Sequence, residues 1–141
     1  MREWAELTIE GKGGGLALLD LTSWQVVKRI KCGLIGGMAV DPDDSRVFAS
    51  DHKLQSLRIV DPSSLADLAV VDLRTDKARS FQPRGVGVLP DGGKVYVVCA
   101  DTSMDAAMAR ATGQATADEY FCAVIDTQSQ EVVKRIPLDA Y

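Results

Sequence analysis

The sequence is poor in histidine and cysteine, which argues against several kinds of site. His52 is the only histidine, and the cysteines Cys32, Cys99 and Cys122 are widely spaced. A zinc site needs several Cys or His ligands, commonly at short spacings, and a disulfide-rich fold needs an even set of cysteines. We therefore expect no metal and three free thiols, with a Cys99–Cys122 bridge between neighbouring strands as the alternative.

The chain also lacks an excess of positive charge and a long apolar run. Its net charge is −4, whereas nucleic acids and anionic membranes attract basic surfaces. No apolar run reaches the length of a membrane span, and the N-terminal MREWAELTIEGKGGG has no apolar signal core. We expect no membrane span and no nucleic acid as the main partner. If the sequence is complete, we expect a cytoplasmic location; otherwise the compartment is unknown.

Phosphate-binding and catalytic motifs are missing as well. The glycine-rich GKGGG (11–15) does not fit the Gly-x-x-x-x-Gly-Lys-Ser/Thr pattern of a phosphate loop, so we predict a hairpin loop there. No Ser-His-Asp or Cys-His arrangement can be recognised. We expect no cofactor, and the sequence favours a non-enzymatic role without deciding it.

What the sequence does contain is an internal repeat. The residues VVKRI occur at 26–30 and again at 132–136. Each copy follows an apolar stretch that ends in Asp, in LALLDLTSWQVVKRI (16–30) and CAVIDTQSQEVVKRI (122–136), and LRIVDPSSLADLAVV (57–71) is a third version. The shared aspartates stand beside turn residues, so we expect their carboxylates to accept hydrogen bonds from turn backbone. Their role is then structural rather than catalytic.

A second unit alternates with the first. GGMAVDPDDSRVFAS (36–50) aligns with GVGVLPDGGKVYVVC (85–99), and the whole pattern recurs about every 40 residues. Each unit consists of short runs rich in Val, Ile, Leu and aromatics, separated by turn residues such as PDD and PDGG. Four strands in a repeat of this size are typical of a propeller blade. We predict an all-β fold, a β-propeller-like array of about three four-stranded antiparallel blades.

These residues resemble the YVTN-type β-propeller repeat family. The best matches to its blade are PRGVGVLPDGGKVYVV (83–98) and AVIDTQSQEVVKRIPL (123–138), and MAVDPDDSRVFASD (38–51) matches moderately. The sequence departs from the family at Cys99, where Asn is usual, and at Gly36, where Pro is usual. The matched residues imply a fold rather than a shared activity, since they are structural in the family.

The blades can be placed on the sequence. We expect one domain over 1–141, with blade one at 4–30, blade two at 36–73 and blade three at 84–137. Blade one lacks an innermost strand, and a short helical or irregular insertion lies near 102–120. Since propellers typically close with four to eight blades, three blades form an incomplete ring. Two copies assemble into a ring, the chain is part of a longer propeller, or it persists as an open stack with its terminal strands as caps.

The resemblance implies that a binding site lies on the loops at one edge of the blades, here 31–35, 51–56, 74–84 and 101–120. Long loops on a rigid scaffold commonly carry function. A basic cluster with one aromatic lies in the third loop and is either an anion site or a solvated loop that balances nearby acids. Its members are Arg74, Lys77, Arg79, Phe81 and Arg84.

The fourth loop predicts a short helix. Ser103 is placed to cap it, and Gly113 to end it. Met104 and Met108 would share one face with two alanines. That face is either a lid or partner-binding surface, or it packs on the blades, and we expect packing.

Asp51 and His52 are adjacent and raise the possibility of an acid–base pair, although a lone loop histidine is more commonly just exposed. The candidate binding face contains Asp51, His52, Arg79, Arg84, Asp101 and Met104. We expect a non-catalytic module that binds a protein or a small ligand, as a fragment or subunit of a larger propeller. The resemblance also admits part of an enzyme, such as a lactonase-type hydrolase or a haem-binding oxidoreductase. Those sites need several polar groups around the central channel, and this chain offers few.

Overall fold

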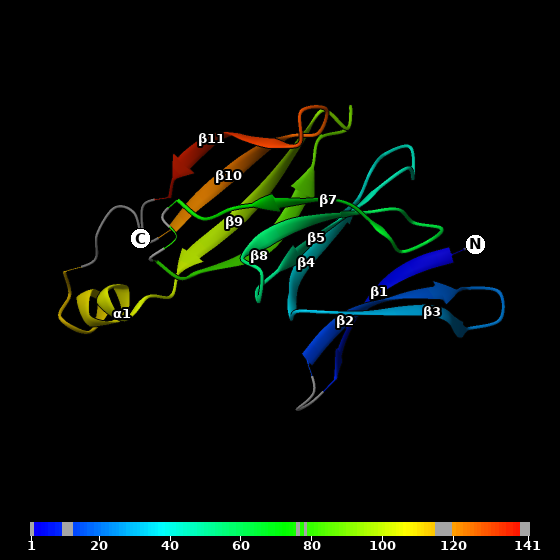
Figure 1. Ribbon diagram of the computed structural model, residues 1–141, viewed down its shortest axis with the longest axis horizontal. Helices are drawn as coiled ribbons and strands as arrows, with labels where there is room; N and C mark the ends of the chain where they lie inside the picture. The colour runs from blue at the N-terminus through cyan, green and yellow to red at the C-terminus, as the bar shows by residue number, and fades with distance from the viewer. Residues whose placement is uncertain (1, 10–12, 76, 78, 115–119, 139–141) are drawn as a thin grey trace.

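Three antiparallel β-sheets follow one another along the chain and lie side by side (Figure 1). The computed structural model describes residues 2–9, 13–75, 77, 79–114 and 120–138. The predicted all-β fold with blade-like sheets is confirmed. The division of 1–141 into one domain with numbered blades stays a prediction.

The first sheet has three strands and the others have four. The first has the order β1 (Arg2–Ile9), β2 (Gly13–Asp20), β3 (Gln25–Cys32). The second, middle sheet has the order β4 (Ile35–Val40), β5 (Val47–Asp51), β6 (Ser56–Val60), β7 (Asp67–Asp72). The third has the order β8 (Phe81–Val88), β9 (Lys94–Asp101), β10 (Tyr120–Asp126), β11 (Glu131–Pro137). Within each sheet the strands pair in sequence order, as hairpins do.

The recurring aspartates close the turns, as predicted. Asp20, Asp61 and Asp126 each accept hydrogen bonds from the backbone N–H groups of the second and third residues that follow. The fourth residue has a left-handed backbone, with φ of 55° at Trp24 and 58° at Leu65. This conformation is uncommon for residues other than glycine, and the aspartate hydrogen bonds help to hold it.

Two hydrophobic cores lie between the sheets, one on each face of the middle sheet. Alternate residues of β5 and β6 point to opposite faces, so one strand supplies both cores. The core shared with the first sheet contains Leu16, Leu18, Ile35, Val47, Ala49, Val60 and Leu65. The core shared with the third sheet contains Phe48, Leu57, Ile59, Val71, Leu73, Phe81, Val95, Val97, Cys99, Phe121, Ala123 and Ile125.

The predicted helix is present as α1 (Met104–Ala111), beyond the end of β9 (Figure 1). The Ser103 side chain accepts a hydrogen bond from Ala106 N, and Gly113 follows the helix with φ of +70°. The expected packing of the methionine face is wrong. Met104 is 76% exposed and Met108 is also exposed. The helix instead packs through Ala106, its buried residue, which is not on the methionine face.

Two other expectations need correction. β8 begins at Phe81 rather than near residue 84, because Phe81 is buried and its N–H donates to Gln55 Oε1 at 2.8 Å. The alternative of a Cys99–Cys122 bridge is wrong, since all three thiols are free. Cys99 belongs to the core against the middle sheet, whereas Cys122 is opposite Val98 on the other face.

Of the predicted hairpin loop GKGGG (11–15), residues 11 and 12 lie outside the described part of the chain, and Gly13, Gly14 and Gly15 belong to β2 rather than to a loop. The flanking strands are antiparallel neighbours, with Ile9 opposite Gly13. Within the residues that the structure describes, no helix has the length and apolar character that a membrane crossing requires.

Candidate functional site

The loops at one edge of the sheets are tied to one another, and Asp51 is the central link. It ends β5, and its Oδ1 accepts from the backbone N–H groups of Lys53 and Leu54 at 2.9 and 3.1 Å. Its Oδ2 accepts from Gly33 N at 3.2 Å and from Arg58 Nε at 2.7 Å. The carboxylate therefore joins the β5–β6 turn to the β3–β4 connection and to β6.

These contacts set the charge state of the Asp51 side chain, which is fully buried. Burial acts to raise its pKa, but the hydrogen bonds from Arg58, Leu54 and Gly33 outweigh burial, so the pKa lies below its ordinary value. Asp51 is an ionised structural hub, and its carboxylate is occupied by backbone and guanidinium donors.

His52 lies against β8, the first strand of the third sheet. Its Nδ1 is 3.1 Å from Gln82 Nε2, and Gln82 Oε1 accepts from Arg84 Nη2 at 2.8 Å. A Cβ atom at Gly36 would collide with His52 Nε2 and lie 2.5 Å from the carbonyl oxygen of Pro83. Glycine is needed at position 36 because the His52 ring and β8 approach this backbone closely.

A second buried carboxylate ends β9. Asp101 is 2.5 Å from Arg79 Nη2 through its Oδ2, and its Oδ1 accepts from Ser103 N at 2.8 Å. The Arg79 guanidinium also lies over the Phe81 ring, 5.9 Å from its centroid. Two contacts thus hold Arg79 in place, and its charge is balanced by an aspartate beneath it.

Two arginines of the predicted basic cluster are neutralised in this way. Arg74 forms an ion pair with Asp72 at 2.6 Å, as Arg79 does with Asp101. Phe81 is buried and Arg84 is on a strand. Two of the four cations in the cluster therefore balance nearby acids, as one of the two alternatives for this loop expected.

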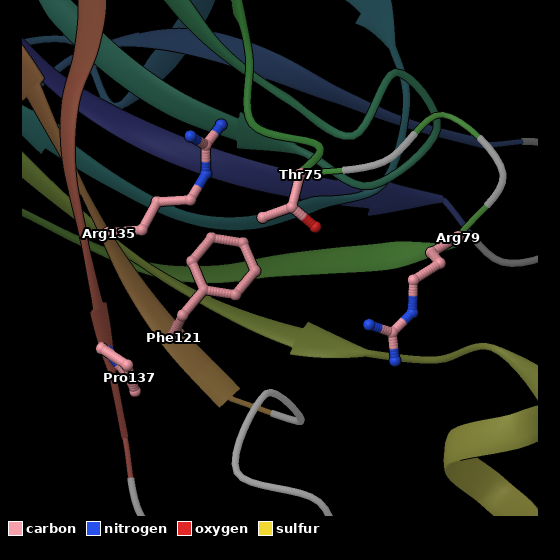
Figure 2. Close-up of a pocket in the computed structure, with 5 residues that line it drawn as sticks. All are labelled: Thr75, Arg79, Phe121, Arg135 and Pro137. Carbon is pink, nitrogen blue, oxygen red and sulfur yellow. The ribbon is translucent and has the colours of Figure 1, made fainter.

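In the described part of the chain, two of the hollows between the loops are relevant here. The larger, about 440 Å³, lies between the first and middle sheets and is lined by Lys31, Cys32, Gly33, Leu34, Asp51, Lys53, Leu54 and Arg58. The smaller, about 280 Å³, lies between the loop after β7 and the last two strands, and Figure 2 shows its lining residues. These are Thr75, Arg79, Phe121, Arg135 and Pro137. Its mixture of an aromatic side chain and two guanidinium groups suits an anion with an apolar part.

The arrangement offers little for acid–base or metal chemistry. The Asp51 carboxylate is bound by the groups listed above, and the His52 ring is directed to Gln82. Among the residues that the structure describes, no group of three His, Cys, Asp or Glu side chains is placed to hold a metal ion. The site's chemistry is that of charge pairing and hydrogen bonding.

The predicted site residues lie in four different places. Asp51 lines the larger hollow, His52 and Arg84 lie at the inner strands, and Arg79 and Asp101 lie at the smaller hollow. Met104 lies on α1 and lines neither hollow.

The predicted binding face missed four lining residues of the smaller hollow, Thr75, Phe121, Arg135 and Pro137. Arg135 belongs to the second copy of VVKRI, and the first copy has the same arginine. No sequence signal therefore distinguished it.

The three face-packed sheets define an all-β protein with a β-propeller-like fold. No protein family model and no curated protein matches the chain. Solved structures similar to it include the hydrazine synthase of Kuenenia stuttgartiensis, with a TM-score of 0.69 and 20% identity over 90% of this chain. A protein of unknown function from Desulfotomaculum acetoxidans DSM 771 has a TM-score of 0.66 and 13% identity over 89% of it. The match spans only 30% and 34% of those two chains.

Proposed function

We propose that the chain is a run of YVTN-type propeller blades that serves as a binding module, and that further sheets of the same kind close it into a ring. The fold of three packed sheets supports the propeller, and the repeat motifs support the family. The observation that carries the proposal is the exposed outer face of the third sheet.

The middle and third sheets can be compared position by position. Met38 pairs with Ala49 in the middle sheet, and Val86 pairs with Val97 at the same point of the third. The residue after Val97 is Val98, so Val98 occupies the position that Ser50 has in the middle sheet. Ser50 is 0% exposed and donates a hydrogen bond to the carbonyl oxygen of Arg84, whereas Val98 is 38% exposed.

Glycines on β4 and β8, the first strands of the middle and third sheets, allow the same comparison. A Cβ atom at Gly37 would lie 2.8 Å from Arg84 O and 3.1 Å from Gly85 Cα, so glycine is needed where the third sheet approaches. Gly85 holds the matching position in the third sheet, and a Cβ there would meet nothing within 4 Å. This comparison supports the proposal that a further sheet packs on the third sheet as the third packs on the middle one.

The first sheet, at the other end of the stack, also has an exposed apolar residue where the middle sheet has a buried one. Trp24 and Leu65 both follow an aspartate turn by the same spacing and share its left-handed backbone. Leu65 is 3% exposed, in the core against the first sheet, while Trp24 is 74% exposed. A preceding sheet would cover Trp24 as the first sheet covers Leu65, and exposed apolar surface of this kind marks an interface.

Binding rather than catalysis is proposed because the candidate acid and base have other contacts. Asp51 is held by Arg58 and backbone donors, and His52 faces Gln82. The loops joined by Asp51 and by the Arg79–Asp101 pair form a fixed surface suited to recognition.

The test is the solution mass of the purified chain, by light scattering after size exclusion, beside a Val98→Glu variant. A discrete oligomer that Val98→Glu dissociates supports a ring made from copies. Heterogeneous larger species that Val98→Glu reduces support sheets supplied by a longer chain. Both effects of Val98→Glu are expected because a charged glutamate on the outer face of the third sheet disfavours the packing of another sheet on that face.

Leu68→Glu is the matched control, since Leu68 is an exposed leucine on β7, the outer strand of the sheet whose two faces are already covered. It should leave the mass distribution unchanged. A monodisperse monomer that melts cooperatively would contradict the proposal, and so would equal effects of the two glutamates.

A further inference from the structure

The smaller hollow has a rigid apolar floor. Phe121 is buried and packs edge to face against Phe81, with ring centroids 5.3 Å apart and planes at 81°. Such pairs hold both rings in place. Pro137 adds a second apolar wall from β11. Any ligand in the hollow therefore meets a fixed aromatic surface.

Two guanidinium groups flank this floor. Figure 2 shows the Phe121 ring between the side chains of Arg79 and Arg135, with Thr75 beside it. Arg79 is fixed by Asp101 at 2.5 Å. Arg135 donates from Nη2 to the carbonyl oxygen of Arg74 at 3.2 Å, and in the described part of the chain it forms no ion pair with a carboxylate.

The two guanidinium groups differ in their partners. Among the residues that the structure describes, Arg79 is paired with the buried carboxylate of Asp101, whereas Arg135 has no carboxylate partner. The Arg135 head retains N–H donors beyond the one used by Arg74 O, and the Thr75 hydroxyl can also donate. A singly charged anion would pair with Arg135 and take up these donors.

We propose that the hollow binds a small monoanionic carboxylate with a planar apolar body. The carboxylate pairs with Arg135 and takes a hydrogen bond from Thr75, while the planar part lies on Phe121. The volume of about 280 Å³ suits a single ring or a short chain rather than a larger ligand. This proposal goes beyond ring closure and is independent of it, because every lining residue named belongs to this chain.

The test is a titration followed by NMR chemical shifts, with benzoate as the probe. Benzyl alcohol supplies the ring without the charge, and inorganic phosphate supplies charge without the ring. Benzoate should bind saturably, about tenfold or more tighter than either, because a charge-assisted hydrogen bond and ring contact act together. The perturbed signals should include those of Phe121 and Thr75.

Arg135→Gln should weaken benzoate binding about tenfold or more. Lys134→Gln is the matched control, since it removes the same charge from the adjacent residue of β11, whose side chain points to the opposite face. It should change the affinity less than about twofold, as screened charge at a distance does. Arg135→Lys keeps the charge but not the planar fork and should have an intermediate effect.

Equal losses in the glutamine variants would overturn the proposal, because they would indicate attraction by net charge alone. So would equal binding of benzyl alcohol or of phosphate, or the absence of saturable benzoate binding. These outcomes are separate from the solution mass, so this site can fail while ring closure stands, and the reverse.

Discussion

At the scale of single residues, the repeated aspartate is the clearest link from sequence to structure. Asp61 accepts from Ser63 Oγ at 2.7 Å and from Ser64 N at 2.7 Å. These hydrogen bonds, that from the Ser63 side chain first, lower the pKa of Asp61 to about 2. The turn therefore depends on an ionised carboxylate.

This makes part of the stability dependent on pH. The ordinary pKa of Asp is about 3.9, so the unfolded chain binds a proton at Asp61 before the folded chain does. The contribution is complete above about pH 4 and is lost as the pH falls through about 2. We expect the difference in urea midpoint between the wild type and Asp61→Asn to be constant from about pH 7 to 5 and to shrink below about pH 4.

A Ser63→Ala background provides the control. Without the Ser63 hydroxyl the pKa of folded Asp61 should rise toward its ordinary value, so the shrinkage, which still begins near about pH 4, should be smaller and should end at a higher pH. A midpoint difference that stays the same down to pH 3 would show that the ionised form has no special role.

At the scale of elements, Asp51 joins three segments that are separate in sequence. Its turn hydrogen bonds copy those of Asp61, and it adds Arg58 and Gly33. Asp51→Ala should lower the free energy of unfolding by about 3 kcal/mol, because it leaves Arg58 with Asp67 alone and half-buried. Urea unfolding measures this.

Asp61→Ala is the matched comparison, since it removes the same kind of turn without a buried ion pair. Its effect should be clearly smaller. If Asp51→Ala and Asp61→Ala lower the free energy of unfolding equally, Asp51 acts only as a turn residue, and its contacts with Arg58 and Gly33 do not add to stability.

Elements also show where prediction from sequence ends. The strands and the capped helix were predictable because turn residues and Ser103 act locally. The exposure of Met104 and Met108 was not, because it depends on where α1 lies relative to β9. The start of β8 was missed for a similar reason, since Gln55 from another sheet sets it.

At the scale of the whole molecule, the repeat predicted three stacked sheets but not the binding hollow. A repeat pattern predicts only the features that its copies have in common. The hollow instead depends on where Thr75, Phe121 and Arg135 lie relative to one another in space, which is not a property that the copies share. The pairing of Arg79 with Asp101 likewise joins residues from a loop and a strand end. Such contacts follow from tertiary packing, which spacing alone does not encode.

The matched glycines give a prediction at this scale. In a Val98→Glu background, which keeps the outer face free, Gly37→Ala should lower stability by about 1–3 kcal/mol, since its Cβ meets backbone at 2.8 Å. Gly85→Ala should change it by no more than about 0.5 kcal/mol, since its Cβ meets nothing. Thermal or urea unfolding measures both.

In the wild-type background Gly85→Ala should instead weaken association, because the added methyl group lies where a neighbouring sheet would approach. Equal stability losses in the Gly37→Ala and Gly85→Ala variants, or unchanged association of Gly85→Ala in the wild-type background, would contradict the inference that Gly85 faces an absent sheet as Gly37 faces the third sheet.

The middle sheet is a common wall between the two cores. Phe48 and Ile59 face one core, and Val47, Ala49 and Val60 face the other. A packing defect in β5 or β6 is therefore felt in both cores at once, while a defect in β2 or β10 is confined to one. Tolerance to substitution should therefore be lowest in β5 and β6, and within β7 it should be higher at the exposed Leu68 and Val70 than at the buried Val71.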